Sequence, residues 1–207
     1  KQYWMHLAGM YSEKEWDDKA LSAYFASYHQ GFLIRETEIV MLSQRLLGAD
    51  NPYEASMVLE RGFEDGTVTR NEKNLKLLAT SYTMAQEMPE AIKAWSDAAG
   101  YAKGGDIHYR LAQALAQEDR HSEAVRAYRK ALEKKGLSKE SDVQFWLAIA
   151  LMNLERWDEA TRAFRAAERI DRRKQKSVRQ YIRYISGERR RQQEPTARDR
   201  SRRNGQP

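Results

Sequence analysis

The chain of 207 residues contains no cysteine and has only four prolines and four histidines. Without cysteine it forms neither disulfide bonds nor thiolate metal sites, although this absence does not identify the compartment. The prolines, at positions 52, 89, 195 and 207, leave the interior of every expected helix uninterrupted. No apolar run of about 18 residues occurs, so the sequence predicts no transmembrane span.

Signals of catalysis and cofactor binding are missing as well. The histidines, His6, His29, His108 and His121, fall on different expected helices and show none of the spacings that hold zinc. No glycine-rich loop is placed to cradle a phosphate, because the glycines fall near expected helix ends. We therefore expect a protein that is not an enzyme and that has no metal site and no cofactor.

What the sequence does contain is an internal repeat of helical pattern. A small residue recurs at Ala20, Ala55, Ala91, Ala124 and Ala160, and the differences between these positions are 35, 36, 33 and 36 residues. Apolar residues three and four positions apart surround each alanine, as amphipathic helices require, and no strand pattern competes. The period predicts an all-α solenoid, in which each hairpin buries its apolar face against its neighbours.

Two helix starts can be read directly from the sequence. Asn51, Pro52 and Glu54 have the order of an N-cap, a proline at the first helical position and a capping-box glutamate. Pro89 occupies the corresponding place in the next repeat. We therefore expect helices to begin at these two prolines.

The residues around each alanine resemble the tetratricopeptide repeat (TPR) family. That family places a bulky residue, a leucine, a small residue and a large residue on its first helix, then a small, an aromatic and a small residue on its second. One copy supplies Leu75, Leu78, Ala79, Tyr82, Ala91, Trp95 and Ala98. The resemblance implies a right-handed solenoid of about five hairpins over residues 1–173, acting in protein binding.

Parts of the chain also resemble the C-terminal repeats of gammaproteobacterial envelope TPR proteins that are associated with TonB/ExbB/ExbD-type systems. The similar phrases are QGFL, NPYEASMVLERG and NEKNLKLLA. This resemblance implies an exported, periplasmic assembly factor or adaptor. The chain begins at Lys1 without an initiator methionine or a visible signal peptide, so we expect a fragment or a mature form.

Basic residues are concentrated near the C-terminus. Residues 1–167 hold 22 Lys/Arg and 25 Asp/Glu, a net charge of −3, whereas residues 168–207 hold 14 and 5, a net charge of +9. Residues 187–207 have almost no aliphatic side chains and are expected to form a basic disordered tail. Residues 174–186 are expected to form a capping helix, with an apolar side at Val178, Tyr181, Ile182 and Ile185.

The resemblance also predicts a binding groove. In TPR proteins the first helix of each hairpin lines the concave side, so the residues two before and two after the family's leucine point into the groove. These are Met5, Gly9, Val40, Gln44, Lys76, Thr80, Tyr109, Gln113, Phe145 and Ile149. Only Lys76 is cationic, which disfavours the carboxylate clamp of one TPR subclass. An extended peptide or a partner helix suits this groove better.

From this list we take Gln44, Lys76, Thr80, Tyr109, Gln113, Phe145 and Ile149 as the expected partner-binding residues. For Phe145 and Ile149, packing between repeats is an equally good interpretation.

The sequence thus leaves two functional hypotheses. The first is a protein-interaction scaffold or adaptor that binds a peptide or helix in its groove, in the bacterial periplasm. The alternative is a cytoplasmic scaffold whose arginine-rich tail contacts nucleic acid or an anionic membrane. The tail has no aromatic residue for base stacking and the repeat body is slightly acidic, which makes nucleic acid the less favoured partner. The sequence leaves homo-oligomer formation open.

Overall fold

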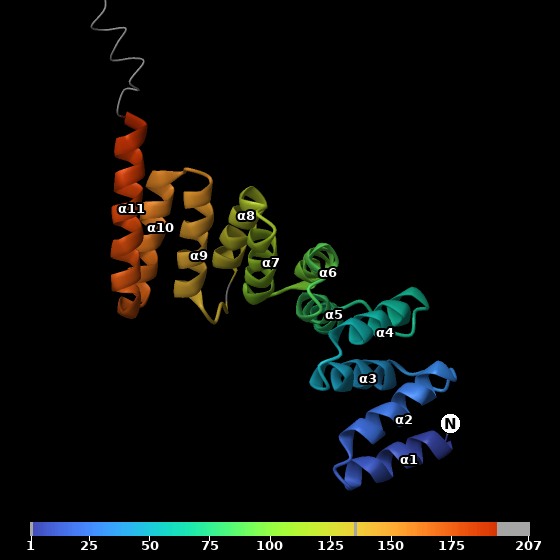
Figure 1. Ribbon diagram of the computed structural model, residues 1–207. Coiled ribbons are helices and arrows are strands. Elements are labelled where there is room, and N and C mark those ends of the chain that lie inside the picture. Colours follow the sequence, from blue (N-terminus) through green and yellow to red (C-terminus); the bar gives the residue numbers. More distant parts are fainter. Residues whose placement is uncertain (1, 135, 194–207) are drawn as a thin grey trace, which may run out of the picture. The chain divides into compact units, whose positions relative to one another are not determined.

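A computed structural model of the chain describes residues 2–134 and 136–193 (Figure 1). All regular elements in these residues are helices, which confirms the predicted all-α fold class. The chain divides into two compact units, an N-terminal unit, Lys1–Lys103, and a C-terminal unit, Gly104–Pro207. Within the described ranges, no helix combines the length and the apolar character that crossing a membrane requires.

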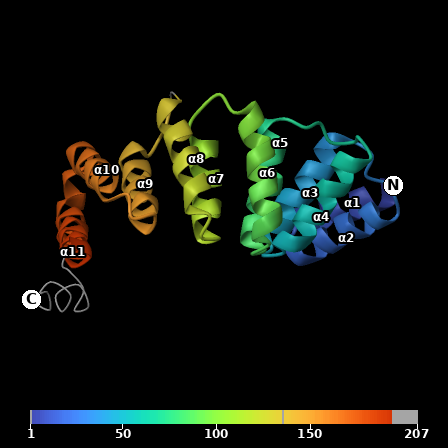
Figure 2. The same ribbon diagram turned by 90° about the horizontal axis from the view of Figure 1, so that it is seen from above.

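The N-terminal unit consists of three antiparallel helical hairpins that contact one another in chain order (Figures 1 and 2). Within each hairpin the two helices form the most extensive contacts of the unit. The helices are α1 (Gln2–Glu13), α2 (Asp17–His29), α3 (Glu36–Gly48), α4 (Pro52–Glu64), α5 (Glu72–Met84) and α6 (Met88–Tyr101).

The C-terminal unit contains two further hairpins and a long last helix that packs on the second of them. Its elements are α7 (Asp106–Gln117), α8 (His121–Glu133), α9 (Glu140–Asn153), α10 (Trp157–Ile170), a short 3₁₀ turn (Arg172–Lys174) and α11 (Gln175–Gln193). Figure 2 shows α9, α10 and α11 following one another in this unit.

The small residues of the repeat lie where the two helices of each hairpin cross. Their side chains have no exposed surface, which agrees with the register predicted from the sequence: Ala20, Ala55, Ala91, Ala124 and Ala160. Large side chains such as Leu59, Tyr128 and Phe164 are fully buried beside them. Small side chains at such positions allow two helices to approach closely, and larger side chains fill the space around them.

Every hairpin also turns in the same way, a feature that we did not predict. The residue in the middle of each turn has a left-handed backbone with φ between 53° and 62°: Glu15, Asp50, Gln86, Asp119 and Glu155. The amide of the following residue then donates to a carbonyl five residues earlier, as from Glu87 N to Tyr82 O at 3.0 Å. This bond satisfies a carbonyl that the end of the first helix leaves without an intrahelical donor.

The structure corrects details at both predicted helix starts, and α6 begins at Met88, so that Pro89 is its second residue. Pro52 is the first residue of α4, as expected, but the Asn51 side chain makes no capping hydrogen bond. With a φ of −114° and a ψ of 62°, Asn51 is not in the extended conformation typical of an N-cap, and its Nδ2 donates back to Ala49 O at 3.2 Å. The predicted capping box with Glu54 is therefore wrong.

Successive hairpins are linked by acidic residues at the starts of first helices. Glu36 accepts hydrogen bonds from Thr69 Oγ1 at 3.0 Å and Asn74 Nδ2 at 2.6 Å, and these bonds lower the pKa of its carboxyl group. In the C-terminal unit, Asp106 accepts from the Ser138 amide and hydroxyl, both at 3.1 Å. Each acid therefore ties the beginning of its helix to the beginning of the next hairpin.

The last helix extends beyond the predicted cap. Val178 and Ile185 are 0% and 2% exposed, so the apolar side of α11 is buried as expected. The helix continues to Gln193, however, because residues beyond 186 bind α10: Arg189 pairs with Asp158 at 2.6 Å, and Gln192 accepts from Trp157 Nε1 at 3.1 Å. Residues 187–193, which we expected in the tail, are therefore helical. Residues 194–207 lie outside the described residues.

Candidate functional site

A cleft of about 310 Å³ lies in the C-terminal unit, between the first helices of its two hairpins. Helices α7 and α9 form its walls and α8 contributes to its floor. We call it the α7–α9 cleft, and its lining residues are Gln113, Ala116, Gln117, His121, Tyr128, Trp146, Ile149, Ala150 and Asn153. Its volume is at the lower end of the range of small-ligand pockets, about 300–1,000 Å³, and a cleft of this kind can take in one or two side chains.

Two of the predicted binding residues meet in this cleft. Gln113 comes from α7 and Ile149 from α9, and both are half-buried. The Gln113 side chain is oriented by its neighbours: Nε2 donates to Tyr109 Oη at 3.2 Å, and Oε1 accepts from Arg110 at 3.3 Å. The amide is thereby held at the wall of the cleft.

Tyr109 lies beneath this surface instead of projecting from it. Its side chain is 7% exposed, and its ring centroid is 6.1 Å from that of Tyr128. Burial, assisted by the nearby charge of Asp142, raises the pKa of the Tyr109 hydroxyl. The residue therefore supports Gln113 and leaves little of its own surface for a partner.

Phe145 takes part in the packing of the last hairpin. Its ring lies 5.4 Å from Phe164 on α10 and 5.7 Å from Tyr181 on α11, both in edge-to-face contacts. The Lys174 ammonium lies 5.5 Å from the same ring centroid. These contacts explain why Phe145 is absent from the lining of the α7–α9 cleft.

The remaining predicted residues belong to the N-terminal unit. Gln44 on α3 and Lys76 on α5 are exposed, and Thr80 is half-buried with its hydroxyl donating to Lys76 O at 2.8 Å. Gly9, Met5 and Val40 lie on the first helices of this unit, Val40 being buried. None of these residues lines the α7–α9 cleft.

The cleft contains residues that the sequence analysis missed, most clearly Trp146. Its indole is 44% exposed, an unusual position for so large an apolar group. Trp146, Ile149 and Asn153 are separated by three and four residues, so they lie on one face of α9. This spacing could have been seen in the sequence. The family's repeat pattern, however, places groove residues two positions before and after Leu147, and so it predicted Phe145 instead of Trp146.

The polar groups of the cleft are almost all uncharged. Gln113, Gln117 and Asn153 supply amides, and His121 is the one titratable imidazole in the lining. Asn153 Nδ2 and His121 Nε2 lie 3.1 Å apart, whereas His121 Nδ1 is buried without a hydrogen-bond partner. Such a lining suits a neutral ligand with an apolar group and free backbone amides, because side-chain amides both donate and accept hydrogen bonds.

A second, larger cleft of about 650 Å³ lies between α4, α5 and α6 in the N-terminal unit. Charged groups predominate among its polar side chains, and four of these side chains bind one another: Arg70 pairs with Asp97 at 2.7 Å, and Tyr82 Oη donates to Glu60 at 2.7 Å. Burial, followed by the interaction with Glu60, raises the pKa of Tyr82. Because two of its pairs are already formed and its remaining polar groups include charged Glu64, Glu90 and Lys93, the largely uncharged α7–α9 cleft is the better candidate for binding an apolar side chain.

In the part of the chain that the structure describes, no group of three or more His, Asp or Glu side chains gathers at a spacing that would hold a metal ion. His108 is 9% exposed and buried within its hairpin, away from the lining of either cleft.

Comparison with known proteins agrees with this arrangement of helices. Residues 105–133, which span α7 and α8, match the tetratricopeptide repeat family. A crystal structure of MamA protein superimposes with a TM-score of 0.67 at 20% identity, covering 84% of this chain and 93% of MamA. The fold is that of TPR proteins.

A second solved structure with this fold is YrrB, described as a TPR protein with an unusual peptide-binding site. It has a TM-score of 0.64 at 16% identity, and the alignment covers 81% of this chain and 84% of YrrB. No curated protein matches the chain in sequence. At these identities the likeness concerns the fold alone.

Proposed function

We propose that this protein is a non-enzymatic scaffold or adaptor that binds a peptide or helix of a partner protein in the α7–α9 cleft. The observation that carries the proposal is the exposed Trp146 beside Ile149, surrounded by the amides of Gln113 and Asn153. Aromatic side chains at the centre of a partly desolvated pocket contribute much of the binding energy in protein interfaces. The description of YrrB as peptide-binding supports this class of function.

The binding mode follows from the chemistry of the lining. An apolar side chain of the partner enters between Trp146 and Ile149, where its burial provides the favourable free energy. The amides of Gln113, Gln117 and Asn153 bind the partner's backbone, whose N–H and C=O groups otherwise lose their hydrogen bonds to water. The pairing of Gln113 with Tyr109 orients one amide in advance, which lowers the entropy that binding costs.

For location and biological setting, we propose the periplasm of a bacterial cell, in association with a TonB/ExbB/ExbD-type system. The support is the resemblance of the phrases QGFL, NPYEASMVLERG and NEKNLKLLA to envelope TPR proteins. Fractionation of cells that express the chromosomal gene with a C-terminal epitope tag tests this location. Recovery of the protein with cytoplasmic markers would contradict it.

The cleft is tested by selecting peptides from a random library on the immobilised chain and measuring their Kd by fluorescence anisotropy. Trp146→Ala combined with Ile149→Ala should weaken the selected peptides at least tenfold, because each substitution removes an apolar contact of about 1 kcal/mol or more. Circular dichroism establishes that helix content is retained.

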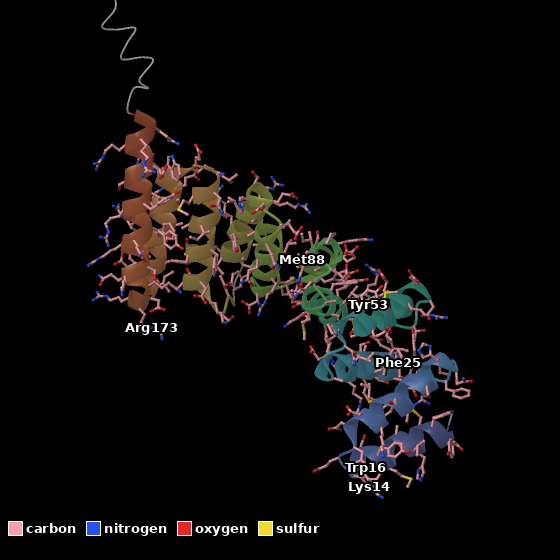
Figure 3. The ribbon with its side chains drawn as sticks, in the orientation of Figure 1. Lys14, Trp16, Phe25, Tyr53, Met88 and Arg173 are labelled. Atoms are coloured by element: carbon pink, nitrogen blue, oxygen red, sulfur yellow. The ribbon has the colours of Figure 1, made fainter. Side chains whose placement is uncertain are left out.

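The matched control removes two exposed apolar side chains from the N-terminal unit, Trp16→Ala with Met57→Ala, which are 46% and 42% exposed. Figure 3 shows Trp16 beside Lys14, at the turn between α1 and α2. This control should change Kd less than twofold. If it abolishes binding and the cleft variant does not, the binding surface lies elsewhere.

A further inference from the structure

The outer side of α11 carries a line of cations that the repeat fold does not use. Lys176, Arg179, Arg183 and Arg190 are exposed, and they are separated by three, four and seven residues. At 3.6 residues per turn, these spacings place all four on one narrow face of the helix over about 21 Å. We call this line the basic stripe. In Figure 3, nitrogen-ended side chains project from the side of α11 that faces away from α10.

The stripe differs from the other cations around α11 because no acid in residues 2–134 or 136–193 pairs with it. Lys174 pairs with Asp142 at 2.6 Å, Arg189 with Asp158 at 2.6 Å and Arg191 with Glu188 at 2.8 Å. The first two pairs connect α11, or the turn before it, to α9 and α10, and the third lies within α11. Within the described residues, no ion pair involves a member of the basic stripe. Four like charges in a line repel one another, and this repulsion destabilises the folded protein. An anionic surface bound to the stripe would offset the repulsion.

We propose that the basic stripe docks the C-terminal unit on the anionic headgroups of a lipid bilayer. A helix that lies on a flat surface contacts it along one line of side chains, which is the geometry of the stripe. Each cation near an anionic membrane surface contributes to binding, and several together suffice for a reversible attachment.

The packing of α11 determines whether the helix inserts into the bilayer or only lies on its surface. An amphipathic helix that enters a bilayer does so with its apolar side. Here that side is already buried, because Val178 and Ile185 are 0% and 2% exposed against the repeats. The helix therefore remains folded on the protein, and only its charged side contacts lipid. Binding of this kind is electrostatic and falls with ionic strength.

The same arrangement is less suited to nucleic acid. A helix that enters a groove of duplex DNA meets phosphates of both strands, whereas the stripe is a single line with uncharged residues such as Gln180 beside it. A single strand is held by aromatic rings among the cations, on which its bases stack. No aromatic residue lies between the four cations on their face of α11.

The proposal is tested by flotation of the full chain with vesicles at about 0.1 M salt. Vesicles of phosphatidylcholine with phosphatidylglycerol should bind the protein, and vesicles of phosphatidylcholine alone should not. In the full chain, K176Q/R179Q/R183Q/R190Q should lower partitioning to anionic vesicles at least tenfold, since the attraction of four cations to the anionic surface is lost. Raising the salt to about 0.5 M should release the wild-type protein.

A matched control removes four exposed cations that lie outside α11, K73Q/K93Q/K103Q/R126Q, and so makes the same change in net charge. It should change partitioning less than threefold. If both quadruple variants bind vesicles alike, attachment is a matter of net charge and the stripe is not the docking surface. If the wild type binds single-stranded or duplex DNA more tightly than anionic vesicles at equal salt, and the stripe variant loses that binding, the partner is nucleic acid and the proposal is wrong.

Discussion

His108 shows how one residue within a repeat couples the fold to pH. Its side chain is 9% exposed, and its Nε2 atom is buried without a hydrogen-bond partner. Burial disfavours the imidazolium ion, and the positive charges of Lys134 and Lys130 add to this effect, so the pKa of His108 lies below its ordinary value of 6.5. The folded protein therefore holds this histidine neutral at a pH at which the unfolded chain begins to protonate it.

The sign of the pH effect follows from this difference. Because the pKa is lowered on folding, the contribution of a neutral His108 is present above about pH 6.5 and is lost as the pH falls below that value. We expect His108→Phe to remove this contribution to the pH dependence. Urea unfolding at pH 8 and pH 5 measures the effect: the wild type should lose more stability than the variant between these two values. Equal losses in both proteins would show that His108 is already solvated in the folded state.

At the scale of the element, the hairpin turn is the feature that recurs most regularly. All five turns carry a non-glycine residue with positive φ, and in each the next amide closes the turn by a hydrogen bond of 2.9 to 3.0 Å to the preceding helix. A side chain in this conformation brings its Cβ close to the neighbouring carbonyl and costs about 1 kcal/mol or more. Each turn therefore stores a small strain that the hydrogen bond and the helix packing outweigh.

Relief of that strain should be measurable at Gln86, whose φ is 62°. Gln86→Gly should raise the free energy of unfolding by about 0.5–1 kcal/mol, because glycine adopts positive φ without steric cost. The control is the same kind of substitution in a helix interior, Lys93→Gly, which should instead lower stability by about 1 kcal/mol. Chemical denaturation of both variants gives the comparison. A loss of stability in Gln86→Gly would mean that the glutamine side chain contributes more than its backbone strain costs.

At the scale of the whole molecule, α11 covers the apolar surface at the end of the C-terminal unit. The last hairpin presents Phe145 and Phe164 to α11, and Tyr181 stacks on Phe164 with ring centroids 5.0 Å apart. Val178 and Ile185 complete this contact. In a repeat fold the last hairpin has no following hairpin to cover its apolar surface. A helix with one apolar side and one polar side must therefore cover that surface.

A chain that ends at residue 173 should therefore unfold at a lower temperature than the full chain. Burial of Val178 and Ile185 alone contributes about 3 kcal/mol or more, and the aromatic contacts of Tyr181 add to this. Thermal unfolding followed by circular dichroism tests the expectation. Substitution of the four cations of the basic stripe by glutamine should leave the melting temperature nearly unchanged, because they bury no apolar group and no described acid pairs with them. If the shortened chain melts like the full one, α11 is not a structural cap.

Much of the fold was predictable because it depends on local pattern. The alanine period places the helix crossings, and the apolar spacing gives each helix a buried side; both are properties of contiguous sequence. The five alanines are indeed fully buried, and Pro52 does begin a helix. The failed capping box at Asn51 and Glu54 shows the limit of such reasoning, because the preceding left-handed residue, Asp50, changes where the asparagine side chain can reach.

The candidate site depended on contacts between elements far apart in the chain. The repeat register placed Tyr109, Gln113, Phe145 and Ile149 at groove positions, with packing between repeats as an equal possibility for the last two. Of these four, only Gln113 and Ile149 line the α7–α9 cleft. Tyr109 is covered beside Tyr128, and Phe145 packs against Phe164 and Tyr181. A side chain at a groove position can contact a partner only if no other part of the protein packs over it.

The sequence by itself determined the all-α class, the number of hairpins and the side of each helix that is buried, because these follow from the repeat period and residue size. Only the tertiary structure decided that Trp146 borders a cleft, that α11 reaches Gln193 and that no acid among the described residues pairs with four of its cations. The physical reason is the same in each case. Exposure, and the charge pairs that connect different helices, depend on neighbours some thirty residues away, as between Arg189 and Asp158, and a local pattern does not contain those neighbours.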